Sequence, residues 1–235
     1  MKTETQNKIC DFDLTLVLPC KNEAAAVGAC LDEAKRFLAE SGLRGELLLV
    51  DNGSDDGSAD VALAHGARVV REERPGYGCA LRTGIAAASA DVILMGDCDT
   101  TYDFMQLDLL YAPLAGGGCD VMVGDRFAGG VEPGAMPLSH KWGVKALSAL
   151  ARLRFHTDVR DFHCGLRGLT RAAVEQMCLR ADGMEFATEF IAEAARRGLR
   201  IGQVPVRLRR CALQRSSKLR TIRDGFRHLG YILAG

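Results

Sequence analysis

Asp97 and Asp99, one residue apart at the end of an apolar stretch, are the side chains of this 235-residue chain best suited to chemistry. Carboxylates at this spacing can share a hard divalent cation with a substrate, because Mg²⁺ binds through one or two carboxylates plus phosphate oxygens. A loop with two solvated acids is the alternative interpretation, since D-x-D occurs often by chance. Other acidic loops are expected beside Asp97 and Asp99, and this favours the metal site.

A second cluster has the features of a diphosphate site. Gly76 and Gly78 precede an expected helix, and Arg74 and Arg82 lie nearby in the sequence. Glycines at a helix N-terminus let backbone N–H groups approach phosphate oxygens. The cluster lacks both the complete G-x-G-x-x-G fingerprint and the G-K-[ST] of a P-loop. The sequence therefore predicts a nucleotide fold of another kind.

Apolar runs alternate with helical patterns through the first 125 residues, and this alternation positions the polar clusters. Strands are expected at residues 14–18, 46–50, 68–71, 91–95 and 120–123, with helices between them. This rhythm is typical of an α/β fold whose mostly parallel sheet is flanked by helices. Polar clusters at 19–23, 51–56 and 97–99 each follow a strand, so we expect them at the edge where such sheets bind ligands.

The second half of the chain has a different pattern. We expect a loop at 129–136, a strand at 201–206 and helices at about 141–153, 171–179 and 185–197. A closing helix carries Leu219, Ile222, Phe226 and Leu229 at spacings of three and four, with arginines between them. This basic amphipathic helix is suited to a membrane surface or to packing on the domain.

The formal net charge of zero hides an uneven distribution. Residues 1–120 hold 10 basic and 20 acidic side chains, and residues 121–235 hold the reverse. Beyond residue 194, eleven Lys and Arg accompany one acid, Asp224, which indicates an anionic partner such as phosphate, a membrane surface or nucleic acid. A solvated helix face is the alternative. The acidic first half and the lack of clustered aromatic residues argue against nucleic acid.

Composition narrows the class of protein. With 48% apolar and 26% charged residues the chain is expected to be globular, and no run of apolar residues is long enough to predict a transmembrane helix. The polar first ten residues lack the apolar core of a signal peptide, which favours a cytoplasmic location. The nine cysteines contain no C-x-x-C pair, so we expect reduced thiols rather than zinc ligands or disulfides.

Several motifs occur together and in order. They are LPCKNE at 18–23, VDNGSDDGS at 50–58, GDCD at 96–99, GDR at 124–126, DFHCGLR at 161–167, GMEF at 183–186, SKLR at 217–220 and RDG at 223–225. The combination resembles glycosyltransferase family 2, which has the GT-A fold, and the likeness covers about residues 13–230. Within that family the chain is similar to the branch of dolichyl- and polyprenyl-phosphate hexose synthases.

The resemblance implies roles for individual residues. Together with the glycine cluster, it assigns nucleotide-sugar binding to Pro19, Asn22, Glu23, Asp51, Gly76, Arg82 and Asp97. Asp97 and Asp99 would ligate Mg²⁺ or Mn²⁺. The acceptor phosphate would be received by Arg126, Lys141, Arg215, Lys218 and Arg220. The chain departs from the family pattern at Asn52, which replaces an acid, and at residues 140–143, which match loosely.

The family inverts the anomeric centre of the sugar, which implies direct displacement of the diphosphate. A phosphate acceptor arrives ionised and needs cations, whereas a hydroxyl acceptor needs a carboxylate to take its proton. Asp161, Glu185 and Glu189 are the candidates for that base. Alternatively, Asp161 orients Arg167, and Glu185 caps its helix.

The expected activity is metal-dependent transfer of a hexose from a UDP- or GDP-sugar to polyprenyl or dolichyl phosphate. The alternative is a soluble enzyme of the family that acts on a hydroxyl of a saccharide, a small molecule or a protein. We expect a polar extension at 1–12, a catalytic domain at 13–210 and a basic amphipathic segment at 211–235. The protein would then lie at the inner face of the membrane as a peripheral enzyme, alone or as a homo-oligomer.

Overall fold

A seven-stranded sheet forms the centre of the protein. The computed structural model describes residues 11–211 and 221–234. The strands, in the spatial order β3-β2-β1-β4-β6-β5-β7, are β1 (Leu14–Cys20), β2 (Gly45–Asp51), β3 (Arg68–Arg71), β4 (Val92–Met95), β5 (Val121–Asp125), β6 (Arg167–Thr170) and β7 (Ile201–Pro205). Neighbouring strands are parallel except that β6 is antiparallel to both β4 and β5. The predicted mostly parallel sheet is confirmed.

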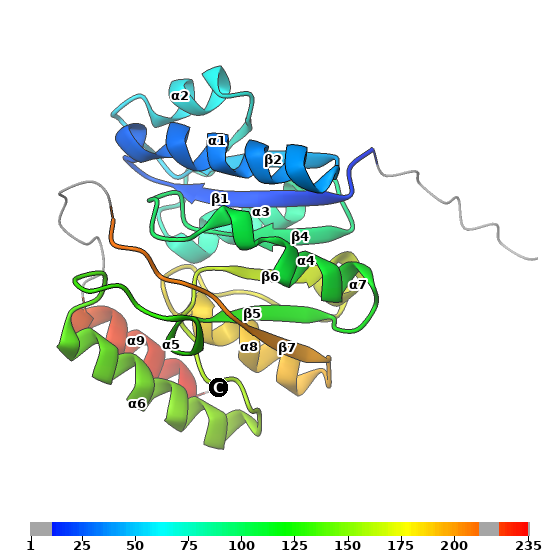
Figure 1. Ribbon diagram of the computed structural model, residues 1–235. Helices are drawn as coiled ribbons and strands as arrows, with labels where there is room; N and C mark the ends of the chain where they lie inside the picture. The colour runs from blue at the N-terminus through cyan, green and yellow to red at the C-terminus, as the bar shows by residue number, and fades with distance from the viewer. Residues whose placement is uncertain (1–10, 212–220, 235) are drawn as a thin grey trace, which may run out of the picture.

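Helices cover both faces of this sheet. They are α1 (Ala24–Ser41), α2 (Ser58–Ala64), α3 (Tyr77–Ala87), the short 3₁₀ helix η1 (Phe104–Gln106), α4 (Asp108–Ala115), α5 (Arg126–Gly129), α6 (Leu138–Phe155), α7 (Arg171–Gln176), α8 (Phe186–Arg196) and α9 (Thr221–Ala234). In Figure 1, α1 and α4 lie in front of the sheet, α3 and α8 lie behind it, and α6 and α9 pack together beyond β5. Strands covered on both faces need continuous apolar runs, which is the pattern of β1 and β4.

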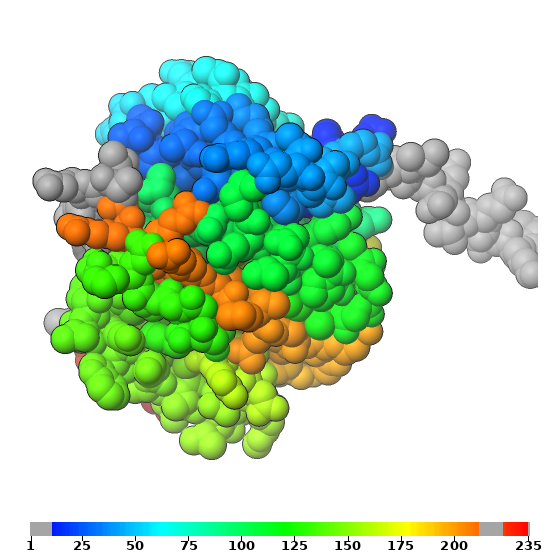
Figure 2. All heavy atoms as spheres, viewed as in Figure 1, coloured from blue at the N-terminus to red at the C-terminus, as the bar shows by residue number. Residues whose placement is uncertain are grey.

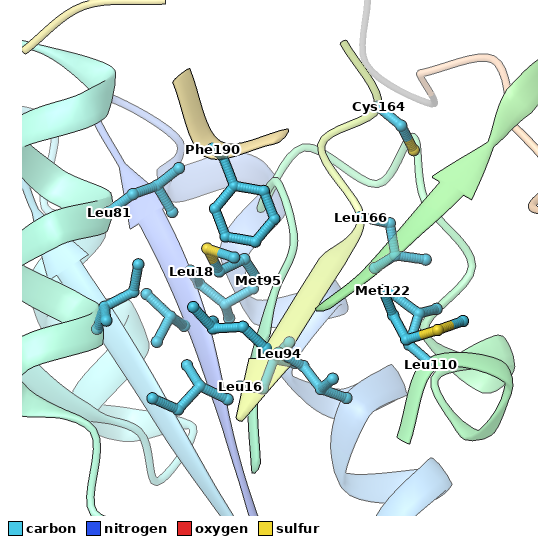
Figure 3. Packing of buried hydrophobic residues seen from close by; sticks show 14 of the residues in the cluster. Leu16, Leu18, Leu81, Leu94, Met95, Leu110, Met122, Cys164, Leu166 and Phe190 are labelled. Carbon is cyan, nitrogen blue, oxygen red and sulfur yellow. The ribbon is translucent and has the colours of Figure 1, made fainter. Parts of the chain in front are cut away.

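The core lies against the central strands of the sheet. Figure 3 shows Leu81 of α3 and Phe190 of α8 beside Leu18 and Met95, and all four side chains are buried. Burial of a side chain of this size stabilises the fold by about 1.5–3 kcal/mol. Because β1 pairs with both β2 and β4, the loops that follow these three strands emerge at one edge of the sheet.

Strand β6 is the part of the sheet that sequence reasoning missed. Its four residues include Arg167 and Gly168, so neither an apolar run nor an alternating pattern marks it. The strand fits between its neighbours because Gly168 has no side chain, and a Cβ there would meet Leu94 and Leu114. The predicted helix at 171–179 is also shorter than expected, since the backbone N–H of Cys178 donates to Glu193 of α8.

The predicted closing helix is present as α9, and it packs against α6 and α8. Asp224, His228 and Ile232 are buried against the domain, whereas Phe226 and Leu233 are exposed. The face that packs therefore combines polar and apolar side chains, and Phe226 of the predicted apolar stripe is exposed. Among the described residues, no helix is long and apolar enough to cross a bilayer.

Candidate active site

Asp97 and Asp99 lie just beyond β4, at the same edge of the sheet as the ends of β1 and β2. The Tyr77 hydroxyl donates to Oδ1 of Asp97 at 3.0 Å, and the backbone N–H of Thr101 donates to Oδ1 of Asp99 at 3.1 Å. Burial, and after it the neighbouring charge of Asp99, raise the pKa of Asp97 to about 6. Two carboxylates held this close disfavour each other's ionised form, and a cation between them would offset that cost.

The donor set at Asp97 and Asp99 fits a hard divalent cation. Both groups are carboxylates, which are the ligands that Mg²⁺ and Mn²⁺ prefer. Among the residues that the structure describes, no three His, Cys, Asp or Glu side chains gather to hold a metal ion. A cation at this pair would therefore take its remaining ligands from water or from the phosphates of a substrate, as Mg²⁺ usually does.

The loops after β1 and β2 are joined to each other beside this pair. Asn22 adopts a left-handed backbone conformation, and its N–H donates to the Ser54 hydroxyl at 2.9 Å. The N–H of Ser54 donates in turn to Oδ1 of Asp51 at 3.0 Å, and the N–H of Glu23 donates to the Ser58 hydroxyl at 2.8 Å. The carbonyl oxygen of Pro19 at the end of β1 accepts a hydrogen bond from the Cys98 thiol. Four residues predicted to bind nucleotide sugar thus lie along one edge of the sheet: Pro19, Asn22, Glu23 and Asp51. Their binding role stays a prediction.

Asn52, which sequence reasoning noted only as a departure, braces the next loop. Its amide nitrogen donates to the carbonyl oxygens of Glu72 and Arg74 at 2.9 and 2.8 Å, and its amide oxygen accepts from the N–H of Gly76 at 2.8 Å. An aspartate has no donor for the two carbonyls, so an amide is required here. A polar residue directly after a strand was the available signal, but the partners of Asn52 lie 20 to 24 residues away.

The predicted diphosphate cluster is built against another loop of the protein. A Cβ on Gly76 would meet the carbonyl oxygen of Asp182, and a Cβ on Gly78 would meet that of Ala181. The N–H of Cys79 in the first turn of α3 donates to the same Asp182 carbonyl at 3.2 Å. Arg82 pairs with the Asp182 carboxylate. The glycines thus let this loop approach α3, and the roles of Gly76 and Arg82 toward a nucleotide sugar stay predictions.

Asp161 and Arg126 form an ion pair inside the protein. Nε and Nη2 of Arg126 donate to the two oxygens of Asp161 at 2.7 and 2.8 Å, and the N–H groups of Arg126 and His163 donate to the same carboxylate. Asp161 is fully buried and Arg126 almost so. A carboxylate with four donors and no solvent contact orients a guanidinium, and in this arrangement it is not open to a substrate hydroxyl.

The alternative in which Asp161 orients Arg167 is wrong, because Arg167 has other partners. Its buried guanidinium donates to the carbonyl oxygens of Phe162, Cys164 and Ala187, and this ties the loop at 162–165 to α8. That loop lies against the acidic pair, since a Cβ on Gly165 would meet Oδ2 of Asp97. The positive charges of Arg167 and Arg126 both lower the pKa of Asp97, although burial outweighs them. The two motifs are therefore parts of one site.

The other two predicted bases also have protein partners. Both oxygens of Glu189 accept backbone N–H groups, from Arg180 at 2.9 Å and Ala181 at 2.8 Å, and burial raises the pKa of this carboxyl. Oε1 of Glu185 accepts the N–H of Gly183 at 3.1 Å, and Oε2 lies 3.7 Å from Arg227. Glu185 stands at the N-cap position of α8, as the alternative expected, but its side chain makes no cap bond to the helix.

The predicted acceptor residues are only partly described. Lys141 lies half-buried in the first turn of α6, whereas Arg215, Lys218 and Arg220 lie outside the described residues. Beside Lys141, burial lowers the pKa of His140, and the charge of Arg126 acts in the same direction. The acceptor roles of these cations stay predictions.

Residues 206–211, which we call the strap, cross the edge of the site after β7. In Figure 2 the orange segment that contains the strap crosses the visible face, with green atoms on both sides of it. The N–H of Arg209 donates to the carbonyl of Thr101 at 2.8 Å, and its guanidinium pairs with Glu33 at 2.9 Å and with Asp103. The strap thus fastens the segment that follows Asp99 to α1. The charge of Arg209 was visible in the sequence, but its partners were not.

Comparison with known proteins shows the family of the chain. A family model described as glycosyl transferase family 2 matches residues 15–178. The low-salt glycan biosynthesis hexosyltransferase Agl6 of Haloferax volcanii is 33% identical over 94% of this chain and 53% of its own length. The dolichyl-phosphate hexose transferase of the same organism is 32% identical over 83% of this chain and 82% of its own. The chain thus spans about half the length of Agl6.

A solved structure has the same architecture. Glucosyl-3-phosphoglycerate synthase from Mycobacterium tuberculosis, in complex with Mn²⁺, uridine diphosphate and glucosyl-3-phosphoglycerate, matches with a TM-score of 0.76 and 26% sequence identity. The match covers 95% of this chain and 80% of that chain. The likeness therefore extends over nearly the whole chain rather than over a single motif.

Proposed function

Since the chain belongs to glycosyltransferase family 2 and has the GT-A fold, we propose that it transfers a hexose from a UDP- or GDP-sugar to a polyprenyl or dolichyl phosphate at a membrane surface. The named activity of the dolichyl-phosphate hexose transferase supports a lipid-phosphate acceptor. The Mn²⁺ and uridine diphosphate bound by the solved relative support a metal-assisted nucleotide-sugar donor.

The donor is proposed to bind at the edge formed by the loops after β1, β2 and β4. Asn22 and Asp51 would contact the base and ribose there, and Asp97 and Asp99 would hold Mg²⁺ or Mn²⁺ against the diphosphate. A bound divalent cation supplies positive charge to the leaving diphosphate. The Tyr77 hydroxyl fixes the orientation of the Asp97 carboxylate, which prepares the pair for that role.

One observation carries the choice of a phosphate over a hydroxyl as acceptor. Both oxygens of Asp161 and both oxygens of Glu189 accept protein hydrogen bonds. Glu185 accepts one bond at Oε1, and its Oε2 lies 3.7 Å from Arg227 without a hydrogen bond to the described residues. A hydroxyl needs a base that accepts its proton, whereas a phosphate is already ionised at neutral pH. Its requirement is positive charge, which Lys141 and the basic residues at 215–220 would provide.

The proposal is tested in two steps. Calorimetric titration with UDP and GDP, each with and without Mn²⁺, should show metal-dependent binding of one nucleotide. Asp99→Asn should weaken that binding at least about tenfold, since even residues that only orient metal ligands contribute that much. Asp108→Asn, an exposed acid in the first turn of α4, is the matched control and should bind as the unchanged protein does.

The second step identifies the acceptor. The protein is incubated with radiolabelled sugar nucleotide and either a polyprenyl phosphate or 3-phosphoglycerate, and the label is partitioned between organic and aqueous phases. Label in the lipid supports the proposal. Label transferred only to the hydroxyl of phosphoglycerate would favour the soluble alternative, and a folded protein that binds neither nucleotide would contradict both.

A further inference from the structure

Exposed apolar side chains gather on two neighbouring helices. Among the described residues, eight large hydrophobic side chains are exposed, and six of them belong to α6 and α9. These six are Leu138, Trp142, Leu150, Leu153, Phe226 and Leu233, with exposed fractions between 36% and 76%. We call them the α6/α9 surface. The two helices contact each other, and the Phe155 and Tyr231 rings meet at 6.4 Å between them.

The helical spacing places these residues away from the domain. On α6, Leu138, Trp142 and Leu153 follow one another at intervals of four and eleven residues, which is one face of a helix. The buried face of the same helix is formed by Val144, Ser148, Ala151 and Phe155. Helix α6 therefore has two faces with apolar residues. One packs against the domain, and the other is exposed and belongs to the α6/α9 surface.

Helix α9 is held to the domain by a different face. Nδ1 of His228 lies 2.8 Å from the Thr188 hydroxyl of α8, and the His228 ring packs edge-on against His163 with 4.4 Å between ring centroids. Ile232 is buried beside them. These contacts position α9 without its outward residues, so Phe226 and Leu233 are left for another partner.

The charge around the α6/α9 surface is positive. Helix α6 contains no acid and carries Lys141, Lys145, Arg152 and Arg154. The single acid of α9 is Asp224, which is buried on the inward face, while Arg223 is exposed. Apolar side chains with a tryptophan among them and cations at their flanks match the interface of a bilayer with anionic headgroups. Each cation near such a surface strengthens binding about fivefold.

We propose that the outward faces of α6 and α9 bind an anionic lipid bilayer in the plane of its headgroups. The inference rests on the lipid-phosphate acceptor proposed above and identifies the surface that brings the site to it. Helix α6 follows the loop at 130–137 directly, and that loop follows Arg126 at the start of α5. A bilayer bound to α6 therefore lies next to the wall where the acceptor phosphate is proposed to bind.

Flotation with vesicles tests the surface itself. The protein should float with vesicles of phosphatidylcholine and phosphatidylglycerol, and less with phosphatidylcholine alone. Trp142→Glu and Phe226→Glu should each reduce the bound fraction at least about tenfold, because a charge replaces an apolar side chain that would enter the interface. Leu63→Glu, at an exposed leucine of α2, is the matched control and should float normally. Unchanged nucleotide binding would verify that each variant folds.

Three results would overturn the inference. They are failure of the unchanged protein to float with anionic vesicles, equal loss of flotation in the Leu63→Glu control, and a dimer in light scattering that Trp142→Glu dissociates while vesicles remain unbound. The last result would make the α6/α9 surface a contact between two copies of the chain.

A transfer assay separates this inference from the proposed function. With a short, water-soluble polyprenyl phosphate and no vesicles, Trp142→Glu should transfer sugar as fast as the unchanged protein, and with a long-chain acceptor in anionic vesicles it should be at least about tenfold slower. Flotation without transfer to either acceptor would contradict the proposed function and leave the docking surface standing. Transfer in vesicles that is insensitive to Trp142→Glu would contradict the docking surface alone.

Discussion

Asp161→Asn removes one charge of the buried Arg126–Asp161 pair while keeping the shape of the side chain. The guanidinium of Arg126 then stays buried without a counter-charge, and the new amide places hydrogens toward its N–H groups. Breaking a buried pair in this way costs about 3–5 kcal/mol of unfolding free energy. A domain of this size has about 5–15 kcal/mol of stability, so the variant should remain folded and measurable.

The assay is urea unfolding at pH 7, with a second ion pair as its control. Arg200 and Asp120 have nearly the same two-bond geometry, with 3.0 and 2.7 Å between their atoms, but this pair lies at the surface with the Arg200 side chain 57% exposed. Asp120→Asn should therefore cost less than about 1 kcal/mol. Equal costs for the two variants would refute the argument that burial makes the Arg126–Asp161 pair important.

The same variant decides between a structural and a catalytic Asp161. A structural carboxylate predicts that Asp161→Asn loses stability and that the double variant Arg126→Met/Asp161→Leu recovers part of it, because both charges are then gone. A general base predicts full stability with transfer abolished and donor binding intact. That second pattern would return Asp161 to the role expected from its position in the motif.

Two further predictions concern α9 and α3. Burial lowers the pKa of His228 from 6.5 to about 4, so the unfolded chain binds the proton first, and about 3 kcal/mol of stability should be lost as the pH falls from about 6.5 to 4. Urea unfolding at pH 7 and pH 4.5 should show a smaller loss in His228→Gln, and an equal loss would contradict the assignment. Gly78→Ala brings a Cβ against the Ala181 carbonyl and should cost about 1–3 kcal/mol in thermal or urea unfolding. Gly143→Ala, at an exposed helical position with open space, should instead gain up to about 1 kcal/mol.

The local sequence patterns predicted the strands whose burial shows as a continuous apolar run. The apolar runs of β1, β2 and β4 are continuous because helices cover both faces, and the polar residues that follow them had to meet at one edge. Asp97, Tyr77 and Gly165 each belong to a motif that is visible in the sequence, so each could be predicted to lie near the site. The contact between them depends on the tertiary structure.

Partners that are distant in sequence could not be predicted. Asp161 binds Arg126, 35 residues away, rather than the nearby Arg167. Asn52 has the right chemistry only for carbonyls that tertiary packing brings to it. The outward direction of Phe226 was also hidden, because helical periodicity shows that α9 has an apolar face but not whether that face meets the protein. The buried polar contacts of His228 decide this point.

The acidic first half and the basic second half of the chain supply the strands of opposite lateral halves of one sheet. Residues up to 120 supply β1 to β4, and the later residues supply β5 to β7 with α5 to α9. Strand β6 pairs with β4 and brings the loop at 162–165 against Asp97, so the two halves meet at the acidic pair. In the proposed reaction both substrates are anions, and a phosphate acceptor would be repelled by the carboxylates that hold the donor's cation. In this proposal the carboxylates come from the first half of the chain and the cations from the second half. This separation of charge would let both anions approach the same sugar carbon.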